Sequence, residues 1–299
     1  MMNYRKLFLS NTTLKIIALV AMTFDHIGIF LGDISNPVVL ILRIIGRISF
    51  PLYLFLLTEG LKHTHNKWHY LLKLGIMAII IYFGIFVINS PLIKVSSKFS
   101  LDRVGNIFFE LFLYALTYIL FTLPNKKLKF LGILPILVII TSPIIKFLSI
   151  STFGYVKYHF IYDGFYIQYD ILGLLLFGGI FLCQYLYNSY CRKTLKSDDL
   201  FLSYRNSNNY LFYKDIFISF YIILLSIIFY IVEKVTSNQF INTFINLGMT
   251  SYIVLSIPFI ILYNGKLGYT NKIIKNAFYL YYPIHIVIIF IIFYLISSK

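Results

Sequence analysis

The chain has 299 residues, of which 59% are hydrophobic and only 12% are charged. Soluble domains carry about 25% charged residues, so this composition excludes an ordinary soluble globular protein. The net charge of +15 does not indicate a nucleic-acid partner, because the lysines and arginines fall in short segments between apolar runs rather than on a soluble basic face.

The apolar runs approach or exceed the length of about 18 to 20 residues that crosses a bilayer. Read against the polar breaks between them, they predict an all-α, polytopic membrane bundle of about nine transmembrane helices. The predicted helices cover residues 14 to 32, 37 to 61, 71 to 90, 105 to 123, 130 to 149, 165 to 187, 216 to 235, 240 to 263 and 277 to 296.

The first run follows Arg5 and Lys6, as in a signal peptide, but Asp25-His26 interrupts it and no small-residue cleavage site follows. We therefore predict a membrane helix there.

Lysines and arginines gather in alternate loops, which is typical of cytoplasmic loops. This alternation predicts a cytoplasmic N-terminus. We expect a multi-pass protein of the cell membrane, namely a bacterial plasma membrane. The segment 188 to 215 is the one long polar loop, and with no internal repeat we predict a single membrane domain over 1 to 299.

Ionisable residues inside the predicted spans are the most informative feature of the sequence. A charge at the bilayer centre costs about 2.5 to 3.5 kcal/mol on insertion scales, and such residues mark sites or pathways by default. The residues concerned are Asp25, His26, Arg43, Arg47, Glu59, Glu110, Asp170 and His285.

Asp25 and His26 form the leading candidate site together with two arginines. At 1.5 Å per residue, His26 lies about 18 Å from Leu14, and Arg43 and Arg47 lie about 9 and 15 Å from the other surface, so they share a depth. The two arginines are spaced i, i+4 and therefore share a helix face. Asp25 is the nearest carboxylate that could pair with them. Adjacent helical residues point apart, so we expect His26 to act as a general base rather than as part of a dyad with Asp25. The competing interpretation is a buried ion pair that only fixes helix packing.

Two histidine-containing groups give weaker signals. Tyr281 and His285 are also spaced i, i+4, beside Pro283, and could add a second polar contact to the cavity or simply be satisfied by a backbone carbonyl. His65 and His69 have the spacing of metal ligands without an acidic or cysteine partner, so we predict no metal.

A basic and aromatic segment begins at Glu59 on the predicted inner surface. It could hold an anionic cofactor phosphate, or it could anchor the helix to anionic lipid. The candidate cofactor-binding residues are Glu59, Lys62, His63, His65 and Lys67.

Two polar pairs have helical spacing nearer the outer surface. Asn106 and Glu110 are spaced i, i+4, and Asp163 and Asp170 are spaced i, i+7. Each pair could line one cavity, although each residue taken singly favours a structural role. We therefore expect these four residues to support a site rather than to carry its chemistry.

Three motifs together resemble the TraX family. They are residues 14 to 28, ending in Phe-Asp-His-Ile-Gly, then Arg43-Ile-Ile-Gly-Arg-Ile-Ser-Phe-Pro, then Glu59-Gly-Leu-Lys-His-Thr-His-Asn, where the family pattern has an arginine in place of His65. Shorter matches follow in order at Asn106, Tyr162-Asp163-Gly164 and Tyr279 to His285. The founding members of this family are linked to N-terminal acetylation of pilin, and the family resembles the broader transmembrane acyltransferases.

The resemblance implies a membrane acyltransferase that takes an acetyl group from acetyl-CoA on the cytoplasmic side. The acceptor, a peptide, glycan or lipid amine or hydroxyl, stays open, as does the face from which it enters. Two other functions are also compatible with buried Asp, His and Arg: a proton-coupled transporter, and a scaffold for the assembly of a surface structure.

Overall fold

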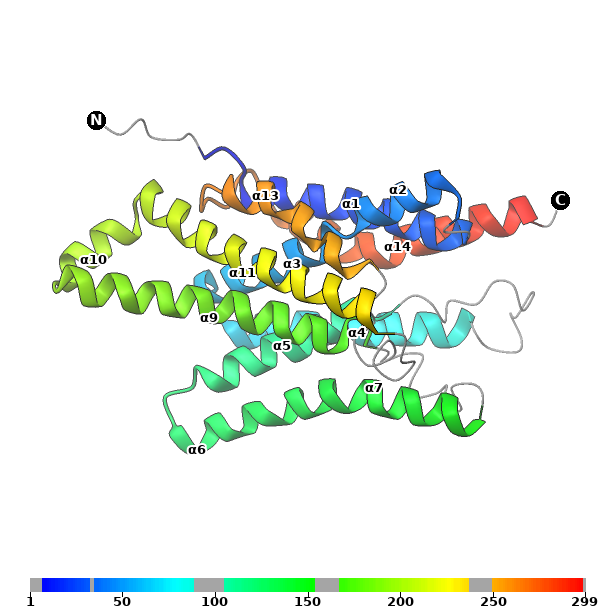
Figure 1. Ribbon diagram of the computed structural model, residues 1–299, viewed down its shortest axis with the longest axis horizontal. Helices are drawn as coiled ribbons and strands as arrows, with labels where there is room; N and C mark the ends of the chain where they lie inside the picture. Colours follow the sequence, from blue (N-terminus) through cyan, green and yellow to red (C-terminus); the bar gives the residue numbers. More distant parts are fainter. Residues whose placement is uncertain (1–6, 33–34, 89–104, 154–166, 237–248, 298–299) are drawn as a thin grey trace. The chain divides into compact units, whose positions relative to one another are not determined.

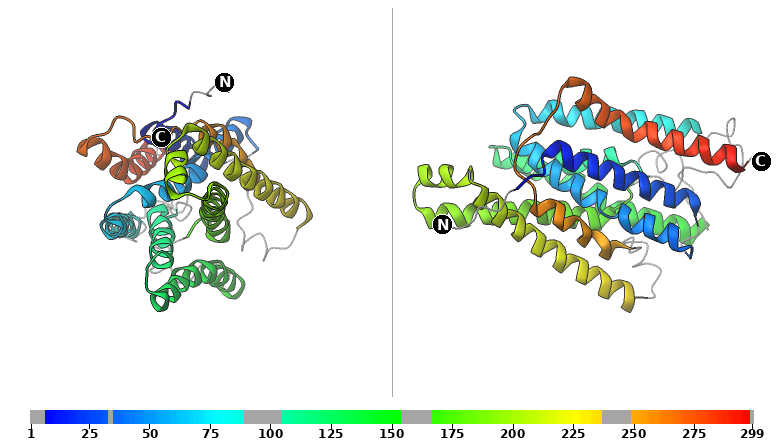
Figure 2. Two further views of the ribbon diagram at one scale, coloured as in Figure 1. Left: turned by 90° about the vertical axis from the view of Figure 1, so that its left-hand side faces the viewer. Right: turned by 90° about the horizontal axis from the view of Figure 1, so that it is seen from above.

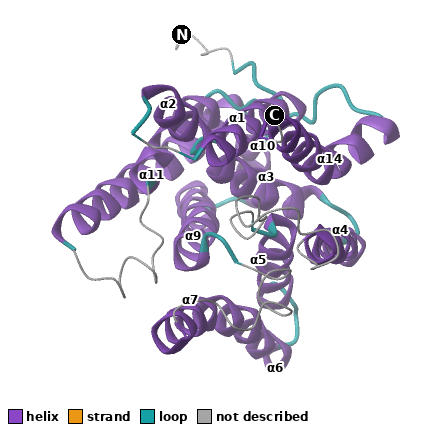
Figure 3. Cartoon of the chain, turned by 90° about the vertical axis from the view of Figure 1, so that its right-hand side faces the viewer, coloured by secondary structure: helices purple, strands orange, loops and turns teal. Residues whose placement is uncertain are grey.

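The computed structural model describes residues 7–32, 35–88, 105–153, 167–236 and 249–297. Throughout these residues the regular elements are helices and no strand is present (Figure 3). An isolated β-bridge joins Leu9 and Tyr263. An all-helical chain satisfies every backbone group within its own segments, which a bilayer core demands. The predicted all-α, polytopic class is confirmed.

Seven of the described helical segments are long and apolar enough to cross a membrane. They are Asn11–Leu31, Pro37–His63, Lys67–Phe86, Lys126–Ile145, Asp170–Leu195, Asn208–Val235 and Lys272–Ile296. Two further apolar helices, Ile107–Phe121 and Thr250–Ile261, are shorter, and they fall within the predicted helices 105 to 123 and 240 to 263. Each of the nine predicted ranges therefore overlaps one of these described segments, and seven of the segments have full spanning length.

The chain divides into two compact units, each assembled from separate segments of the sequence. Unit 1 comprises Met1–Thr58, Leu176–Lys234 and Met249–Phe278, and unit 2 comprises Glu59–Leu175, Val235–Gly248 and Tyr279–Lys299. The single domain expected from the sequence stays a prediction.

In unit 1, helix α1 (Asn11–Leu31) packs against α2 (Pro37–Gly46), and the two lie side by side in Figure 2. Both helices begin at a polar cap that satisfies an otherwise unpaired amide. The Ser10 hydroxyl accepts from the Thr13 amide at 3.2 Å, and the Asn36 side chain accepts from the Val38 amide at 2.9 Å. Pro37 takes the first helical position, where its missing N–H costs nothing.

The predicted helix 37 to 61 is interrupted. Helix α2 ends at Gly46 and helix α3 (Ser49–His63) begins three residues later. Pro51, in the first turn of α3, has no N–H to donate to the carbonyl of Arg47 and its ring crowds that carbonyl, which ends the preceding helix. The Ser49 hydroxyl instead donates to the carbonyl of Gly46 at 2.9 Å. The break places Arg47 in a two-residue turn between α2 and α3.

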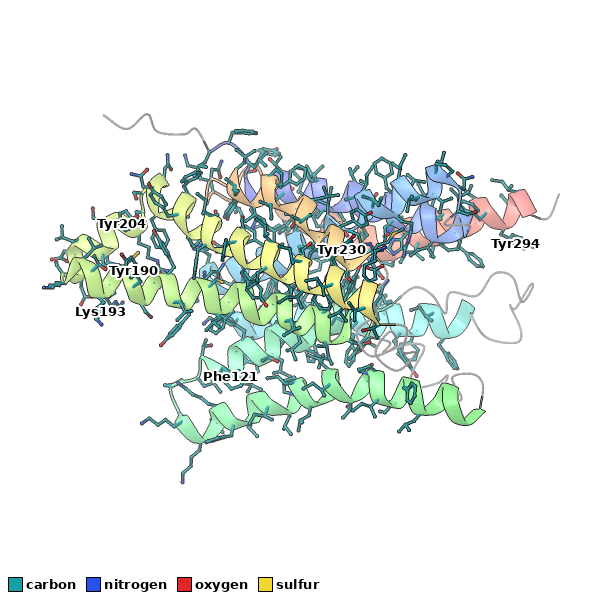
Figure 4. All side chains as sticks on the ribbon, viewed as in Figure 1. Phe121, Tyr190, Lys193, Tyr204, Tyr230 and Tyr294 are labelled. Atoms are coloured by element: carbon teal, nitrogen blue, oxygen red, sulfur yellow. The ribbon has the colours of Figure 1, made fainter. Side chains whose placement is uncertain are left out.

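The prediction that residues 188 to 215 form a long loop is wrong. Helix α9 (Asp170–Leu195) continues past its apolar part, α10 (Asp198–Arg205) follows, and α11 starts at Asn208 and ends at Val235. Figure 1 shows α10 at the end where α9 and α11 meet, and Figure 4 labels Tyr190, Lys193 and Tyr204 around this end.

A small core explains why this polar segment is helical. Cys191, Phe201 and Tyr210 are buried, with Tyr187 and Tyr204 packed against them. The two tyrosine hydroxyls Tyr187 and Tyr204 lie 3.1 Å apart. The helical spacing of these few residues was hidden among the polar ones around them.

Three helices of unit 2 come from the middle of the chain. Helix α4 (Lys67–Ile88) packs against α5 (Ile107–Phe121), which also packs against α7 (Ile133–Phe153). Figure 1 shows α5 and α7 joined at one end by the short helix α6 (Lys126–Lys129), and the η2 turn (Phe130–Gly132) leads from α6 into α7.

The last elements are η3 (Thr250–Ser256), α13 (Ile257–Ile261) and α14 (Lys272–Ser297). The segment after α13 pairs with the start of the chain: Leu9 donates to the carbonyl of Leu262 and Asn264 donates to the carbonyl of Leu9. Part of the predicted helix 240 to 263 lies outside the described residues.

Candidate functional site

The carboxylate of Asp25 is held by both arginines of the Arg43-x-x-Gly-Arg47 motif. Arg43 Nη1 lies 2.8 Å from Oδ1, while Arg47 Nη2 lies 2.7 Å from Oδ1 and 2.9 Å from Oδ2. Asp25 is 4% exposed and Arg47 is 7% exposed. These are the short distances of charge-assisted hydrogen bonds. The predicted pairing of Asp25 with the arginines is confirmed, and it is a three-residue cluster.

Two glycines allow α1 and α2 to approach closely enough for this cluster. A Cβ added to Gly46 would lie 2.3 Å from the Cβ of Asp25, and one added to Gly28 would lie 2.9 Å from Cδ of Arg43. Small residues at helix contacts are the usual means of close packing in a bilayer, where no hydrophobic force drives helices together. The glycine of the motif is therefore a spacer for the ion cluster.

We expect Gly46→Ala to destabilise the protein by about 1 to 3 kcal/mol, because the added methyl overlaps Asp25 and overpacking has costs of this size. Thermal unfolding in detergent measures the effect. Gly178→Ala is the matched control, since nothing lies within 4 Å of its added Cβ. Equal stability of the two variants would contradict the spacer role.

The turn at Arg47 contributes to the same cluster. Arg47 caps the end of α2, and its Nε donates to the carbonyl of Arg43 at 3.3 Å. That bond fixes the guanidinium across the last turn, facing α1. Pro51, which ends α2, thus also positions an ion-pair partner.

His26 follows Asp25 on α1 and is 4% exposed. As neighbours on a helix, the two side chains point in different directions. The burial of His26 next to a cluster that already satisfies Asp25 is compatible with a separate role for the imidazole. Its role as a general base stays a prediction.

The predicted cofactor segment lies in unit 2, where Glu59 pairs with side chains of its own helix. The Glu59 carboxylate is 3.3 Å from Nζ of Lys62 and 3.8 Å from Nε2 of His63. His63 and His65 are exposed, whereas Nζ of Lys67 lies 5.3 Å from the ring centre of Tyr118. The structure thus brings Glu59, Lys62 and His63 together, and it leaves cofactor binding by this segment a prediction.

The polar pair on α5 joins two parts of unit 2. Asn106 caps α5 by accepting from the Phe109 amide, and it donates to the carbonyl of Ala78 at 2.8 Å. Glu110 is fully buried and accepts from the amide of Tyr169 at 2.7 Å, just before α9 begins. These contacts favour the structural role expected for each residue singly.

Asp170, the first residue of α9, is 1% exposed and has φ 39°. The left-handed region is uncommon for a residue with a Cβ, so the neighbouring structure holds this backbone in place. A carboxylate at the first position of a helix is favoured by the helix dipole. Asp163, its expected partner, lies outside the described residues.

His285 is satisfied locally. Its Nδ1 lies 2.8 Å from the carbonyl of Tyr281, and the two rings stack with centres 5.0 Å apart. The neighbouring Tyr282 donates its hydroxyl to the carbonyl of Gly105. Helix α14 stays continuous through Pro283. This geometry favours the alternative in which a backbone carbonyl satisfies the histidine.

Sequence reasoning missed a second buried charge pair. Lys214 and Asp215 lie on α11, just before the predicted start of the apolar run at residue 216, and their side chains are 2% and 0% exposed. Gln184 on α9 is also buried. The sequence does show an adjacent Lys-Asp pair at the edge of a predicted span. Such a pair is equally typical of a helix end that is exposed to solvent.

Among the described residues, no group of three or more His, Cys, Asp or Glu side chains is placed to hold a metal ion. The expectation of a metal-free protein stays a prediction.

Comparison with known proteins supports the resemblance found in the motifs. The family model described as TraX protein matches residues 10–142, so the expected resemblance is confirmed over this part of the chain. The "Probable fimbrial assembly protein FimC, serogroup H1" of Dichelobacter nodosus is 33% identical over 110 residues, which make up 36% of this chain and 44% of that relative. The chain thus spans less than half of that relative's length, and no solved structure matches it.

Proposed function

We propose, from the match of residues 10–142 to the TraX family, that this chain is a membrane-embedded acyltransferase acting in the assembly of a pilus or similar surface structure. The donor in this proposal is acetyl-CoA, and the acceptor is an amine or hydroxyl of a peptide, glycan or lipid. The name of the fimbrial relative supports the assembly context. The family match covers Asp25-His26 and the Arg43-x-x-Gly-Arg47 motif, and these residues support acyl transfer as the proposed chemistry.

The observation that carries the proposal is the cluster of the buried Asp25 and Arg47 with the partly buried Arg43, and with the buried His26 next in the sequence. A buried ion cluster is expensive, and an apolar replacement of similar volume is often equally stable, so stability alone is a weak reason for it. Held guanidiniums in a water-poor site are well suited to stabilise an acyl oxyanion. A guanidinium has five N–H donors, so an arginine that holds Asp25 can also contact a second acceptor.

In the proposed reaction each residue has one task. His26 takes the proton of the attacking amine or hydroxyl as it bonds to the acyl carbon. Arg43 and Arg47 stabilise the negative charge that develops on the acyl oxygen, and Asp25 fixes their orientation. The C–S bond then breaks, and the sulfur leaves as the CoA thiol after taking the proton from His26.

The direct test is to incubate the purified protein in lipid nanodiscs with radiolabelled acetyl-CoA and membrane extract, and then to identify what becomes labelled. The proposal expects a covalently labelled peptide, glycan or lipid that is absent when the protein is omitted. Absence of label with every acyl-CoA tested would contradict an acyltransferase.

A scaffold role in surface-structure assembly is the second candidate, and the name of the fimbrial relative favours it. In that case the charges only pack helices. Assembly would then tolerate neutral replacement of Asp25, His26, Arg43 and Arg47 together. Loss of surface-structure formation in a variant that still inserts and folds would exclude this candidate.

A further inference from the structure

One surface of unit 1 gathers lysines from separate parts of the chain. The segment between α13 and α14 crosses the start of α1 (Figure 2), where the Thr12 hydroxyl donates to the carbonyl of Leu267 at 2.8 Å. One turn further along α1, Nζ of Lys15 lies 5.4 Å from the ring centre of Phe278 on α14. The start of α1, residues 264 to 269 and the start of α14 therefore form one surface, and all three belong to unit 1.

Two ammonium groups come together at Phe278. Lys275 precedes Phe278 by three residues and so lies on the same face of α14, and its charge acts on that of Lys15. Lys275 is exposed and Lys15 is partly exposed, and the exposed Lys266 and Lys272 add two more charges in the same segments. Like charges repel, so this placement costs electrostatic free energy unless an anion joins it.

No carboxylate in these parts of the chain offsets the lysines. Residues 1 to 24 and 234 to 299 contain neither aspartate nor glutamate. None of the four lysines forms an ion pair with any residue that the structure describes. The first turns of α1 and α14 have no acidic residue, so the positive ends of both helix dipoles add to the charge of the lysines. The surface therefore suits an anionic partner.

Large apolar side chains lie exposed in the same segments. Phe8, Leu267, Tyr269 and Ile273 are 62%, 54%, 80% and 78% exposed. Lysines mixed with exposed apolar groups are typical of a membrane interface, where the apolar groups enter the boundary of the acyl chains and the lysines reach the phosphates. A water-soluble phosphate would use the ammonium groups but not the apolar side chains. The combination therefore favours a lipid.

We propose that Lys15 and Lys275 hold the phosphate of an anionic phospholipid between the starts of α1 and α14, with Lys266 and Lys272 at its rim. An ammonium group binds phosphate as a point charge and needs no fixed geometry. The predicted orientation puts this surface at the cytoplasmic leaflet, which carries the negative surface potential. The positive-inside pattern explains why the lysines lie on this side, but not why two from distant parts of the chain come together.

Lipid binding of this kind does not depend on acyl transfer, so its test needs no turnover. Native mass spectrometry of the purified protein measures its affinity for phosphatidylglycerol and for phosphatidylcholine. We expect Lys15→Gln and Lys275→Gln each to weaken phosphatidylglycerol binding about fivefold, the contribution of one lysine near an anionic membrane surface. The double glutamine variant should lose more than either single variant. Phosphatidylcholine binding should stay the same, and the double arginine variant should keep the affinity for phosphatidylglycerol.

A matched control removes two charges elsewhere on the same predicted side of the membrane. Lys193 and Lys196 lie exposed at the end of α9, and Asp198 and Asp199 follow them. Lys196 has φ 50°, a conformation that asparagine tolerates. We expect the Lys193→Gln, Lys196→Asn double variant to bind phosphatidylglycerol like the wild type. An equal loss in this control would show general attraction between a basic protein and an acidic lipid, and it would overturn the inference.

Thermal unfolding gives a second readout, because a ligand that binds the folded state raises the unfolding temperature. Phosphatidylglycerol added to phosphatidylcholine nanodiscs should raise this temperature less in the double glutamine variant than in the wild type or the double arginine variant. A rise of equal size in the wild type and the double glutamine variant would overturn the inference, whatever their stability in phosphatidylcholine alone.

Titration with ADP in phosphatidylcholine nanodiscs tests the other source of phosphate. We expect no ADP binding that depends on Lys15 and Lys275. ADP binding that is lost in the double glutamine variant, together with no preference for phosphatidylglycerol, would replace the lipid by a nucleotide phosphate and overturn the inference.

Discussion

Replacement of His26 by glutamine is expected to lower kcat for acetyl transfer by about 10²- to 10⁴-fold, the usual contribution of a positioned general base. Glutamine keeps much of the size and polarity of the imidazole and removes its ability to take a proton. The structure supports this choice, because the imidazole is buried beside a carboxylate that two arginines already satisfy. The measurement is the initial rate of label transfer from acetyl-CoA.

A loss of activity identifies a catalytic role only if the variant inserts and folds normally. Thermal unfolding in detergent provides that check. His69→Gln serves as the control, since His69 is an exposed histidine outside the proposed machinery, and it should retain wild-type rate. A folded His26→Gln protein with full activity would remove His26 from the mechanism.

Asp25→Leu is expected to destabilise the protein by about 3 to 5 kcal/mol, because its removal leaves the buried guanidinium of Arg47 and the partly buried one of Arg43 without their carboxylate. The loss should appear as a lowered unfolding midpoint in a denaturing-detergent or thermal titration. Asp198→Asn is the control: its carboxylate is 83% exposed and lies 3.7 Å from Arg192. A surface pair of that kind contributes about 0 to 1 kcal/mol.

A triple variant then separates stability from function at the same cluster. Replacing Asp25 by leucine together with Arg43 and Arg47 by methionine removes all the charges, and buried ion clusters replaced in this way often keep or gain stability. We expect the triple variant to regain stability and to stay inactive. Recovery of activity along with stability would support the scaffold function. A triple variant as unstable as Asp25→Leu would show that the unpaired guanidiniums do not cause the destabilisation.

The two charge clusters of unit 1, Asp25 with its arginines and the Lys214–Asp215 pair, differ in how they relate to the family match. Asp25, Arg43 and Arg47 all lie within residues 10–142. The family match therefore covers the ion cluster but not Gln184, Lys214 and Asp215.

The sequence alone determined the fold class and the first ion cluster. Long apolar runs have one stable solution in a bilayer, since every backbone group must be satisfied within a helix. The partners of Asp25 were predictable because a charge at that depth must find an opposite charge, and the i, i+4 arginines on the next helix were the nearest. The short connection between the two helices left little freedom in their pairing.

Only the tertiary structure decided the features that depend on contacts between distant segments. The break at Arg47 was encoded by Pro51, yet its effect on the orientation of the guanidinium needed the packing of α1 against α2. The helical end of α9, with α10 and the start of α11, was hidden because three buried residues in a polar segment carry too weak a periodic signal. The burial of Lys214 and Asp215 could not be assigned from the sequence, because charges at the edge of an apolar run are normally solvated. The packing of Lys214 against Phe55 follows from how α3 and α11 meet, which no local pattern specifies.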